Sequence, residues 1–207
     1  SWAFLYSGER FAGMTASRQI FPASNGTGQA CTPALAWDTL AGAFWQREPR
    51  RLNMDRPTWD EYYMGIARAV SSRSNCIRRN VGALIVVQNA IIAAGYNGTP
   101  MGVRNCYDGG CPRCASDAAP GEGYDTCICV HAEQNAIVLA ARHGNSTSEG
   151  TLYTTLRPCF GCAKEAIQAG IREIVFAEPY EYEEELEDVY RRLHAESGIS
   201  LRQHTGR

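Results

Sequence analysis

The chain from residue 57 onward alternates between helical and strand patterns of apolar residues. Thr58 and Glu61 have the spacing of a capping box behind Pro57, and apolar side chains then recur at helical spacing as far as Ser72. Elsewhere, β-branched runs bounded by turn residues indicate strands, and Gly or Pro marks the ends of helices. The pattern predicts helices at 58–72, 131–143, 159–169 and 182–194, and strands at 81–87, 90–96, 151–155, 171–176 and 199–202.

This order of elements predicts an α/β domain in which a mixed five-stranded sheet is covered by helices on both faces. The first two strands form a hairpin around Gln88-Asn89. Between the hairpin and the second helix lies the segment 97–130, which is rich in Gly, Pro, Asp and Cys. A loop of this length inside a compact domain indicates a functional or metal-binding segment.

The composition suits one globular domain with a further segment attached. The chain has 207 residues, of which 44% are hydrophobic and 20% are charged. Residues 57–207 form the predicted domain, and its expected start is the stretch 54–57. Residues 1–56 show no steady period and are an N-terminal extension of unassigned role. Aromatic residues argue against a fully solvated tail, and a short helix over 34–45 is predicted within it.

Charge and cysteine usage narrow the class of protein. The domain 57–207 has a net charge of −4, and because phosphate contacts dominate nucleic-acid affinity, a small substrate is favoured over a nucleic acid. No apolar run of about 18 residues is present, so no membrane helix is expected, and no secretory signal pattern is seen. Clustered cysteines in such a chain indicate metal sites in a cytoplasmic protein rather than disulfides.

Two segments have the spacing of a zinc site, His131-Ala132-Glu133 and Pro158-Cys159-Phe160-Gly161-Cys162. Together they match H-x-E…P-C-x-x-C, the signature of zinc-dependent nucleobase deaminases. A catalytic zinc needs three protein ligands and one open position, and His131, Cys159 and Cys162 supply the three. Both segments open predicted helices, whose N-terminal dipoles favour thiolates. A purely structural zinc would need a fourth ligand and would give Glu133 no role.

The predicted chemistry is hydrolytic deamination. A bound zinc lowers the pKa of its water to about 7. Glu133 is then expected to move protons from this water to the ring nitrogen and to the departing ammonia. Substitution of Glu133 should therefore keep the metal and abolish turnover, whereas loss of Cys159 should remove both.

Several stretches resemble deoxycytidylate (dCMP) deaminases of the zinc-dependent cytidine/deoxycytidylate deaminase family. They are 58–64, 75–83, 95–100, 131–136 and 158–162. A further stretch, 105–114, resembles the cysteine-rich variant of fungal-type members. The resemblance covers about 57–203 and implies the three-layer α/β/α fold of cytidine deaminases, but it does not extend to residues 1–56.

The resemblance implies conversion of dCMP to dUMP for thymidylate synthesis. It also implies a homohexamer that is activated by dCTP with Mg²⁺ and inhibited by dTTP. The substrate-binding candidates are Asn97, Ala132, Tyr153, Arg78 and Arg79, with the two arginines placed to bind the 5′-phosphate. Arg142 is a candidate for a subunit interface or an effector site. The alternatives are a turn residue for Asn97, a core aromatic for Tyr153 and solvated side chains for the arginines.

A second group of cysteines surrounds the predicted loop. Its members are Cys76, Cys106, Cys111, Cys114, Cys127 and Cys129. Relatives hold a structural zinc at positions matching Cys76, Cys106 and the loop before His131, so the resemblance implies a four-thiolate zinc that fixes the segment 97–130. The spacing does not decide which four of the six bind it, and the other two would be buried free thiols. Cys31 stands apart as an ordinary residue.

Two other functions stay open from the sequence. A polynucleotide deaminase, acting on tRNA adenosine or on single-stranded DNA cytosine, would require a basic channel and stacking aromatics. Only the extension 1–56 offers these, and only weakly. A zinc-stapled binding or regulatory module without activity would have no need of Glu133 beside an intact ligand set. The acidic run 181–188 is interpreted as the solvated face of a helix.

Overall fold

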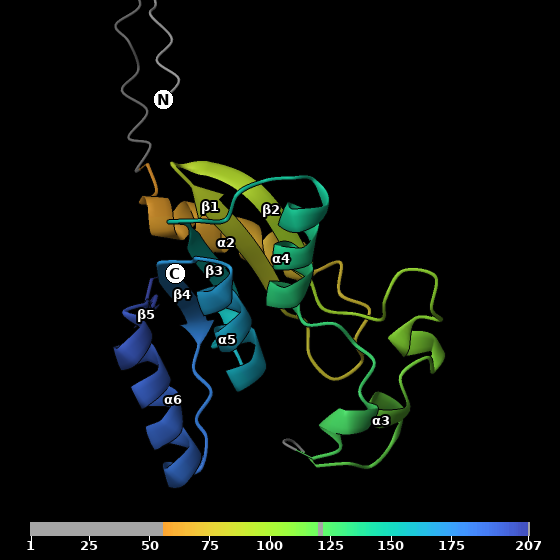
Figure 1. Ribbon diagram of the computed structural model, residues 1–207. Helices are drawn as coiled ribbons and strands as arrows, with labels where there is room; N and C mark the ends of the chain where they lie inside the picture. The colour runs from red at the N-terminus through yellow and green to blue at the C-terminus, as the bar shows by residue number, and fades with distance from the viewer. Residues whose placement is uncertain (1–55, 120–121, 207) are drawn as a thin grey trace, which may run out of the picture. The chain divides into compact units, whose positions relative to one another are not determined.

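The sheet of the domain has five strands in the order β2-β1-β3-β4-β5 (Figure 1). The computed structural model describes residues 56–119 and 122–206, so the helix predicted at 34–45 lies outside the described residues. The strands are β1 (Gly82–Val87), β2 (Ala90–Tyr96), β3 (Thr151–Leu156), β4 (Glu173–Glu178) and β5 (Ser200–Gln203). Strand β1 pairs antiparallel with β2 and β3, whereas β4 pairs parallel with β3 and β5. The predicted mixed five-stranded sheet is confirmed.

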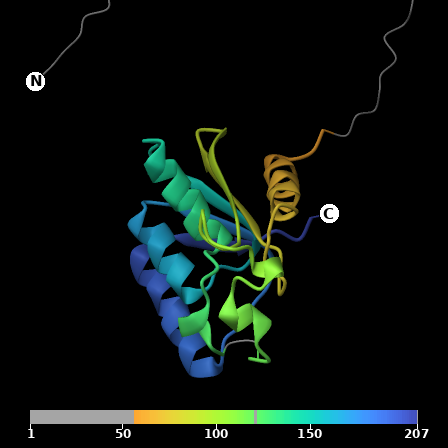
Figure 2. The ribbon, with the colours of Figure 1, turned by 90° about the vertical axis from the view of Figure 1, so that its right-hand side faces the viewer.

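Helices cover both faces of this sheet (Figure 2). They are α2 (Trp59–Ser71), α3 (Pro112–Ala115), α4 (Ala132–Arg142), α5 (Phe160–Gln168) and α6 (Glu184–Ser197). On one face, Tyr63 and Met64 of α2 share a core cluster with Leu84 of β1. On the other face, Ala136 of α4 and Ala166 of α5 lie in the larger cluster, and α6 runs beside α5. The arrangement is the predicted three-layer α/β/α fold.

The predicted capping box and the predicted hairpin turn are also confirmed. The Glu61 N–H donates to Thr58 Oγ1 at 3.3 Å, and the Thr58 N–H donates to the Glu61 carboxylate at 2.7 Å, which completes the capping box. Gln88 and Asn89 have φ angles of 49° and 63°. A two-residue hairpin turn of this kind needs both central residues in the left-handed region, so β1 and β2 reverse tightly here.

The segment 97–130 contains more structure than the single loop that the sequence predicts. It includes the short helical turns Cys106–Asp108, Pro112–Ala115 and Tyr124–Thr126. Its interior is formed by cysteine side chains, four of which are at most 9% exposed. An antiparallel bridge between Gly98 and Val130 joins the two ends of the segment. These turns were not predicted because three or four residues are too few to show a helical repeat of apolar positions.

A close contact between α4 and β2 fixes the position at which α4 begins. A Cβ atom on Gly95 would lie 2.2 Å from the Ala132 carbonyl oxygen, so only glycine allows this approach. The Asn135 side chain donates to the Tyr96 carbonyl at 2.7 Å. The His131 N–H donates to the Gln134 side chain at 3.0 Å. The first turn of α4 is therefore held firmly against the end of β2.

Candidate active site

Three predicted metal ligands meet where two helices begin. His131 is the N-cap of α4, Cys159 is the N-cap of α5, and Cys162 lies in the first turn of α5. His131 Nδ1 lies 3.4 Å from Cys159 Sγ and 3.3 Å from Cys162 Sγ, and the two sulfur atoms are 3.5 Å apart. Segments that are far apart in the sequence thus place one nitrogen and two sulfur atoms around a single point.

These separations fit a tetrahedral zinc. Zn–S bonds of about 2.3 Å and Zn–N bonds of about 2.0 Å would place two sulfurs about 3.8 Å apart and a sulfur about 3.5 Å from the nitrogen. The separations in the structure agree with these values to within about 0.3 Å. The nitrogen that faces the thiols is Nδ1, a choice that the sequence left open. Three ligands leave the fourth position of the tetrahedron for water.

The electrostatics of the site favour a thiolate at Cys159, whereas the contact with Cys159 and burial raise the pKa of the Cys162 thiol. The neighbouring Cys162 thiol lowers the pKa of Cys159 to about 4 in spite of burial, and His131 acts in the same direction. The Cys159 sulfur in turn raises the pKa of His131. Because Cys159 also caps a helix N-terminus, the helix dipole adds to the stabilisation of its negative charge.

Glu133 lies next to this donor set and is almost completely buried. Its side chain is 4% exposed, and one carboxylate oxygen accepts a hydrogen bond from Thr154 Oγ1 at 3.1 Å. Burial raises the pKa of Glu133, although the nearby His131 and the Thr154 hydroxyl act against this rise. Because burial makes the protonated form of its carboxyl group accessible, Glu133 is suited to accept and release protons.

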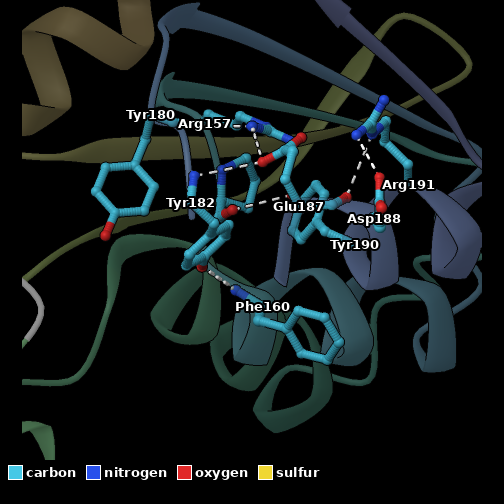
Figure 3. Close-up of polar contacts among 9 residues, drawn as sticks. Arg157, Phe160, Tyr180, Tyr182, Glu187, Asp188, Tyr190 and Arg191 are labelled. Atoms are coloured by element: carbon cyan, nitrogen blue, oxygen red, sulfur yellow. Dashed lines mark hydrogen bonds and ion pairs between the residues drawn. The ribbon is translucent and has the colours of Figure 1, made fainter. Parts of the chain in front are cut away.

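A polar network behind the site involves α6 and the end of β3 (Figure 3). Arg157 forms a two-bonded ion pair with Glu187 at 3.0 and 2.6 Å. The Arg157 guanidinium lies 4.4 Å from the centre of the Tyr190 ring and also donates to the Tyr180 carbonyl at 2.6 Å. These contacts attach α6 to the residue that directly precedes the Pro-Cys-x-x-Cys segment.

Two tyrosines of this network hold the backbone on either side of Cys159. The Tyr190 hydroxyl donates to the Pro158 carbonyl at 3.0 Å. The Phe160 N–H donates to the Tyr182 hydroxyl at 2.7 Å. The residues before and after the cysteine are therefore both fixed by hydrogen bonds, and partners of this kind orient ligands in metal sites.

Asn97 is 8% exposed and supports the backbone around it. Its Oδ1 accepts from the Val81 N–H at 2.8 Å and from Ser74 Oγ at 2.7 Å, and its Nδ2 donates to the Arg79 carbonyl at 2.8 Å. These contacts give Asn97 a structural role beyond that of a simple turn residue. Its predicted contact with a substrate stays a prediction.

The predicted phosphate-binding arginines occupy different environments. The Arg78 guanidinium donates to the carbonyls of residues 113, 114, 116 and 118 at 2.5 to 3.4 Å, so phosphate binding would require it to leave these partners. Arg79 is exposed and lies 3.6 Å from the Glu178 carboxylate. Arg142 is exposed at the C-terminal end of α4. Phosphate binding by Arg78 and Arg79, and the interface or effector role of Arg142, stay predictions.

The structure places Tyr153 and Ala132 in the core. Tyr153 packs on Tyr63 of α2 with ring centres 5.1 Å apart, and its hydroxyl donates to Asp60 at 2.9 Å. Successive side chains of a strand point to opposite faces, so Tyr153 faces α2 whereas Thr154 faces Glu133. Of the two roles predicted for Tyr153, these contacts favour the core aromatic. Ala132 is fully buried in the cluster beneath α4.

The six cysteines of the second group, which are Cys76 and the five in the segment 97–130, also lie together. Their sulfur atoms form two groups in which every pair is within 4.8 Å; one group is Cys76, Cys106, Cys114 and Cys129, and the other is Cys111, Cys114, Cys127 and Cys129. The Cys76–Cys114 and Cys111–Cys127 sulfur separations are 3.8 and 3.9 Å, well beyond the disulfide length of about 2.05 Å. Cys114 and Cys129 belong to both groups.

Sequence reasoning missed the residues that surround the donor set. These are Thr154, Arg157, Tyr182, Glu187 and Tyr190. Strand alternation could have indicated Thr154, and the three-residue spacing of Glu187 and Tyr190 could have placed them on one helix face. The interpretation of the run 181–188 as solvated is wrong for Glu187, whose side chain is only 19% exposed because it pairs with Arg157.

Comparison with known proteins agrees with this geometry. The sequence model of the family described as the cytidine and deoxycytidylate deaminase zinc-binding region matches residues 57–178. The chain is 42% identical over 154 residues to the deoxycytidylate deaminase of Schizosaccharomyces pombe, covering 73% of this chain and 46% of that protein. It is 41% identical over 128 residues to the deoxycytidylate deaminase of Mycobacterium phage D29, covering 59% and 97%. The chain spans about half the length of its curated yeast relatives.

A solved structure with the same fold carries nucleotides. The crystal structure of dCMP deaminase from the cyanophage S-TIM5, in complex with dCMP and dUMP, matches with a TM-score of 0.56 and 32% identity. The match covers 72% of this chain and 98% of that one. Within the part of the chain that the structure describes, no helix combines the length and apolar character needed to cross a membrane.

Proposed function

Because the chain belongs to the cytidine and deoxycytidylate deaminase family, we propose that it hydrolyses dCMP to dUMP and ammonia. The observation that carries the proposal is the donor set of His131, Cys159 and Cys162 with the buried Glu133 carboxyl beside it. The relatives that bear the name deoxycytidylate deaminase support dCMP as the substrate. The net charge of −4 over residues 57–207 supports a small nucleotide over a nucleic-acid strand.

The mechanism assigns one task to each side chain of the site. When bound by His131, Cys159 and Cys162, zinc supplies a water whose pKa falls to about 7. Glu133 takes a proton from the attacking water, gives it to the ring nitrogen and later delivers a proton to the departing amine. Thr154 holds one Glu133 oxygen at 3.1 Å, which leaves the other oxygen to carry the proton. The C–O bond forms first and the C–N bond to the exocyclic amine then breaks, so water and dCMP give dUMP and ammonia.

Two further residues are proposed to bind the substrate. Only one Asn97 amide hydrogen is used by the Arg79 carbonyl, so the other can donate to the sugar or base. Arg79 is proposed to bind the 5′-phosphate, because its ion pair with Glu178 is exposed and therefore weak. A phosphate would replace that carboxylate at little cost.

The finer proposals rest on family resemblance. The protein would act as a cytoplasmic homohexamer, supply dUMP for thymidylate synthesis, and respond to dCTP with Mg²⁺ as activator and to dTTP as inhibitor. The exposed Arg142 at the end of α4 suits a subunit interface or an effector site. The six cysteines of the second group are proposed to hold structural zinc that fixes the segment 97–130, because four thiolates favour tetrahedral zinc.

The catalytic assignment is tested by comparing Glu133→Gln with Cys159→Ser. Ammonia release from dCMP should fall by more than about 100-fold in Glu133→Gln while the zinc content stays that of the wild type. Cys159→Ser should lose the catalytic zinc and the activity together. Glu185→Gln, on the exposed face of α6, is a matched control and should behave as the wild type. Near-normal turnover by Glu133→Gln would overturn the mechanism.

The substrate is tested by comparing kcat/KM for dCMP, cytidine, dCTP and a single-stranded oligonucleotide. We expect dCMP to be preferred. A preference for the oligonucleotide would replace the nucleotide enzyme with a polynucleotide deaminase, and no ammonia from any of them would favour a binding module. Addition of dCTP or dTTP to the dCMP assay tests the proposed regulation separately.

A further inference from the structure

We propose that the six cysteines of the second group bind two zinc ions, which share the sulfur atoms of Cys114 and Cys129. This inference rests on the proposed structural zinc and adds to it a second ion and a bridged geometry. Cys76 and Cys106 complete one tetrahedron, and Cys111 and Cys127 complete the other. The whole chain would then hold three zinc ions, one of them catalytic.

The grouping of the sulfur atoms carries the proposal. The six atoms form two groups of four rather than one group of six, and the two groups have two members in common. Two tetrahedra that share an edge have this composition. The edge of a ZnS₄ tetrahedron is about 3.8 Å, from a Zn–S bond of about 2.3 Å. The Cys76–Cys114 separation in one group and the Cys111–Cys127 separation in the other are 3.8 and 3.9 Å.

The two closely spaced cysteine pairs are divided between the two groups in the same way. Cys111-x-x-Cys114 opens α3, with Cys111 belonging to one group and Cys114 to both. Cys127-x-Cys129 precedes α4, with Cys127 belonging to one group and Cys129 to both. Each pair would thus contribute one terminal and one bridging ligand. The two remaining ligands, Cys76 and Cys106, come from separate turns and close the second tetrahedron.

A single zinc ion would leave two of the six cysteines without a metal. If the ion occupied the group with Cys76, then Cys111 and Cys127 would remain as adjacent thiols 3.9 Å apart, with Cys111 fully buried. If it occupied the other group, Cys76 and Cys106 would remain, the latter 1% exposed. Two ions give all six sulfurs a ligand role, and each ion has four ligands as structural zinc requires.

The first test is the zinc content of the full chain, purified without chelators and measured by inductively coupled plasma mass spectrometry. Three zinc ions per chain are expected. Two per chain would overturn the paired ions while leaving a single structural zinc, and one per chain would overturn both. Zinc X-ray absorption on the same sample should show zinc–zinc scattering. Three ions without that scattering would overturn the shared sulfurs.

Two cysteine variants form a matched pair for the second test. Cys111→Ser removes a terminal ligand, so the zinc content should fall from three to two and the zinc–zinc scattering should disappear. Cys159→Ser should also fall from three to two, but it should keep the scattering, because it affects only the catalytic site. Persistent scattering in Cys111→Ser would overturn the assignment of that site. If Cys111→Ser does not fold, the wild-type measurements still decide the question.

Discussion

The ion pair between Arg157 and Glu187 offers the most direct test of how α6 supports the active site. Their side chains are 10% and 19% exposed, and two hydrogen bonds of 2.6 and 3.0 Å join them. Glu187→Gln keeps the shape of the side chain and removes its charge. The guanidinium then remains beside Tyr190 and the Tyr180 carbonyl without its carboxylate.

The expected loss of unfolding free energy in Glu187→Gln lies between the values for a surface ion pair and for a buried one. Exposed ion pairs contribute about 0–1 kcal/mol, whereas hydrogen bonds to charged groups contribute about 1.5–3 kcal/mol. The low exposure of both side chains favours the second range, and the contacts that Arg157 retains reduce the loss. We expect about 2 kcal/mol, which lowers the Tm by about 4–8 °C in a domain of this size.

The effect should depend on pH in a defined direction. Arg157 lowers the pKa of Glu187 from its ordinary value of 4.5, burial acts against this, and the Tyr182 N–H supports it. A carboxylate with a lowered pKa stabilises the fold above its unfolded pKa, and this stabilisation is lost as the pH falls through the folded pKa. The difference between wild type and Glu187→Gln should therefore be full at about pH 7 and should shrink below about pH 4.

Thermal unfolding of the zinc-loaded protein measures both effects, with Glu185→Gln as the control on the same helix. Acid also releases zinc from thiolates, but this release is common to the two variants and cancels in their difference. A Tm for Glu187→Gln equal to that of Glu185→Gln at neutral pH would refute the stabilising role of the pair. A difference that is unchanged well below the folded pKa of Glu187 would refute its electrostatic origin.

Two further substitutions test neighbouring residues of the site. Thr154→Val keeps the shape of the side chain and removes the hydrogen bond to Glu133. The kcat for dCMP should fall about tenfold, which corresponds to a barrier higher by about 1.4 kcal/mol, while the zinc content stays unchanged. An unchanged kcat would argue against a catalytic role for this contact. Tyr153→Phe removes the bond to Asp60 and should destabilise the fold by about 1 kcal/mol without changing KM for dCMP; a raised KM at unchanged stability would restore the substrate role predicted for Tyr153.

The sequence was sufficient for the elements and for the donor set. Apolar periodicity predicted every strand of the sheet and the four longer described helices, with boundaries that differ by up to three residues. Strand β4, for example, begins at Glu173 rather than at residue 171. The donor set was predictable because its residues match the spacing of a known zinc signature, H-x-E…P-C-x-x-C, and both segments lie at the start of a predicted helix.

The environment of the donor set could not be read from the sequence, because it consists of contacts between distant segments. Arg157 and Glu187 are thirty positions apart, so the sequence does not show that these two side chains pair. The bonds that Arg78 makes to the segment 113–118 likewise depend on how that segment folds. Cysteine spacing predicted a cluster, but the division of six sulfurs into two overlapping groups appears only in three dimensions.

The two halves of the catalytic donor set are supported by separate parts of the fold. His131 follows Cys129 by two residues, and the intervening Val130 pairs with Gly98, so the cysteine cluster and β2 fix this ligand. Cys159 and its neighbours are fixed instead by the tyrosines at and before α6. The histidine and the two thiolates of the donor set are therefore positioned by different parts of the fold.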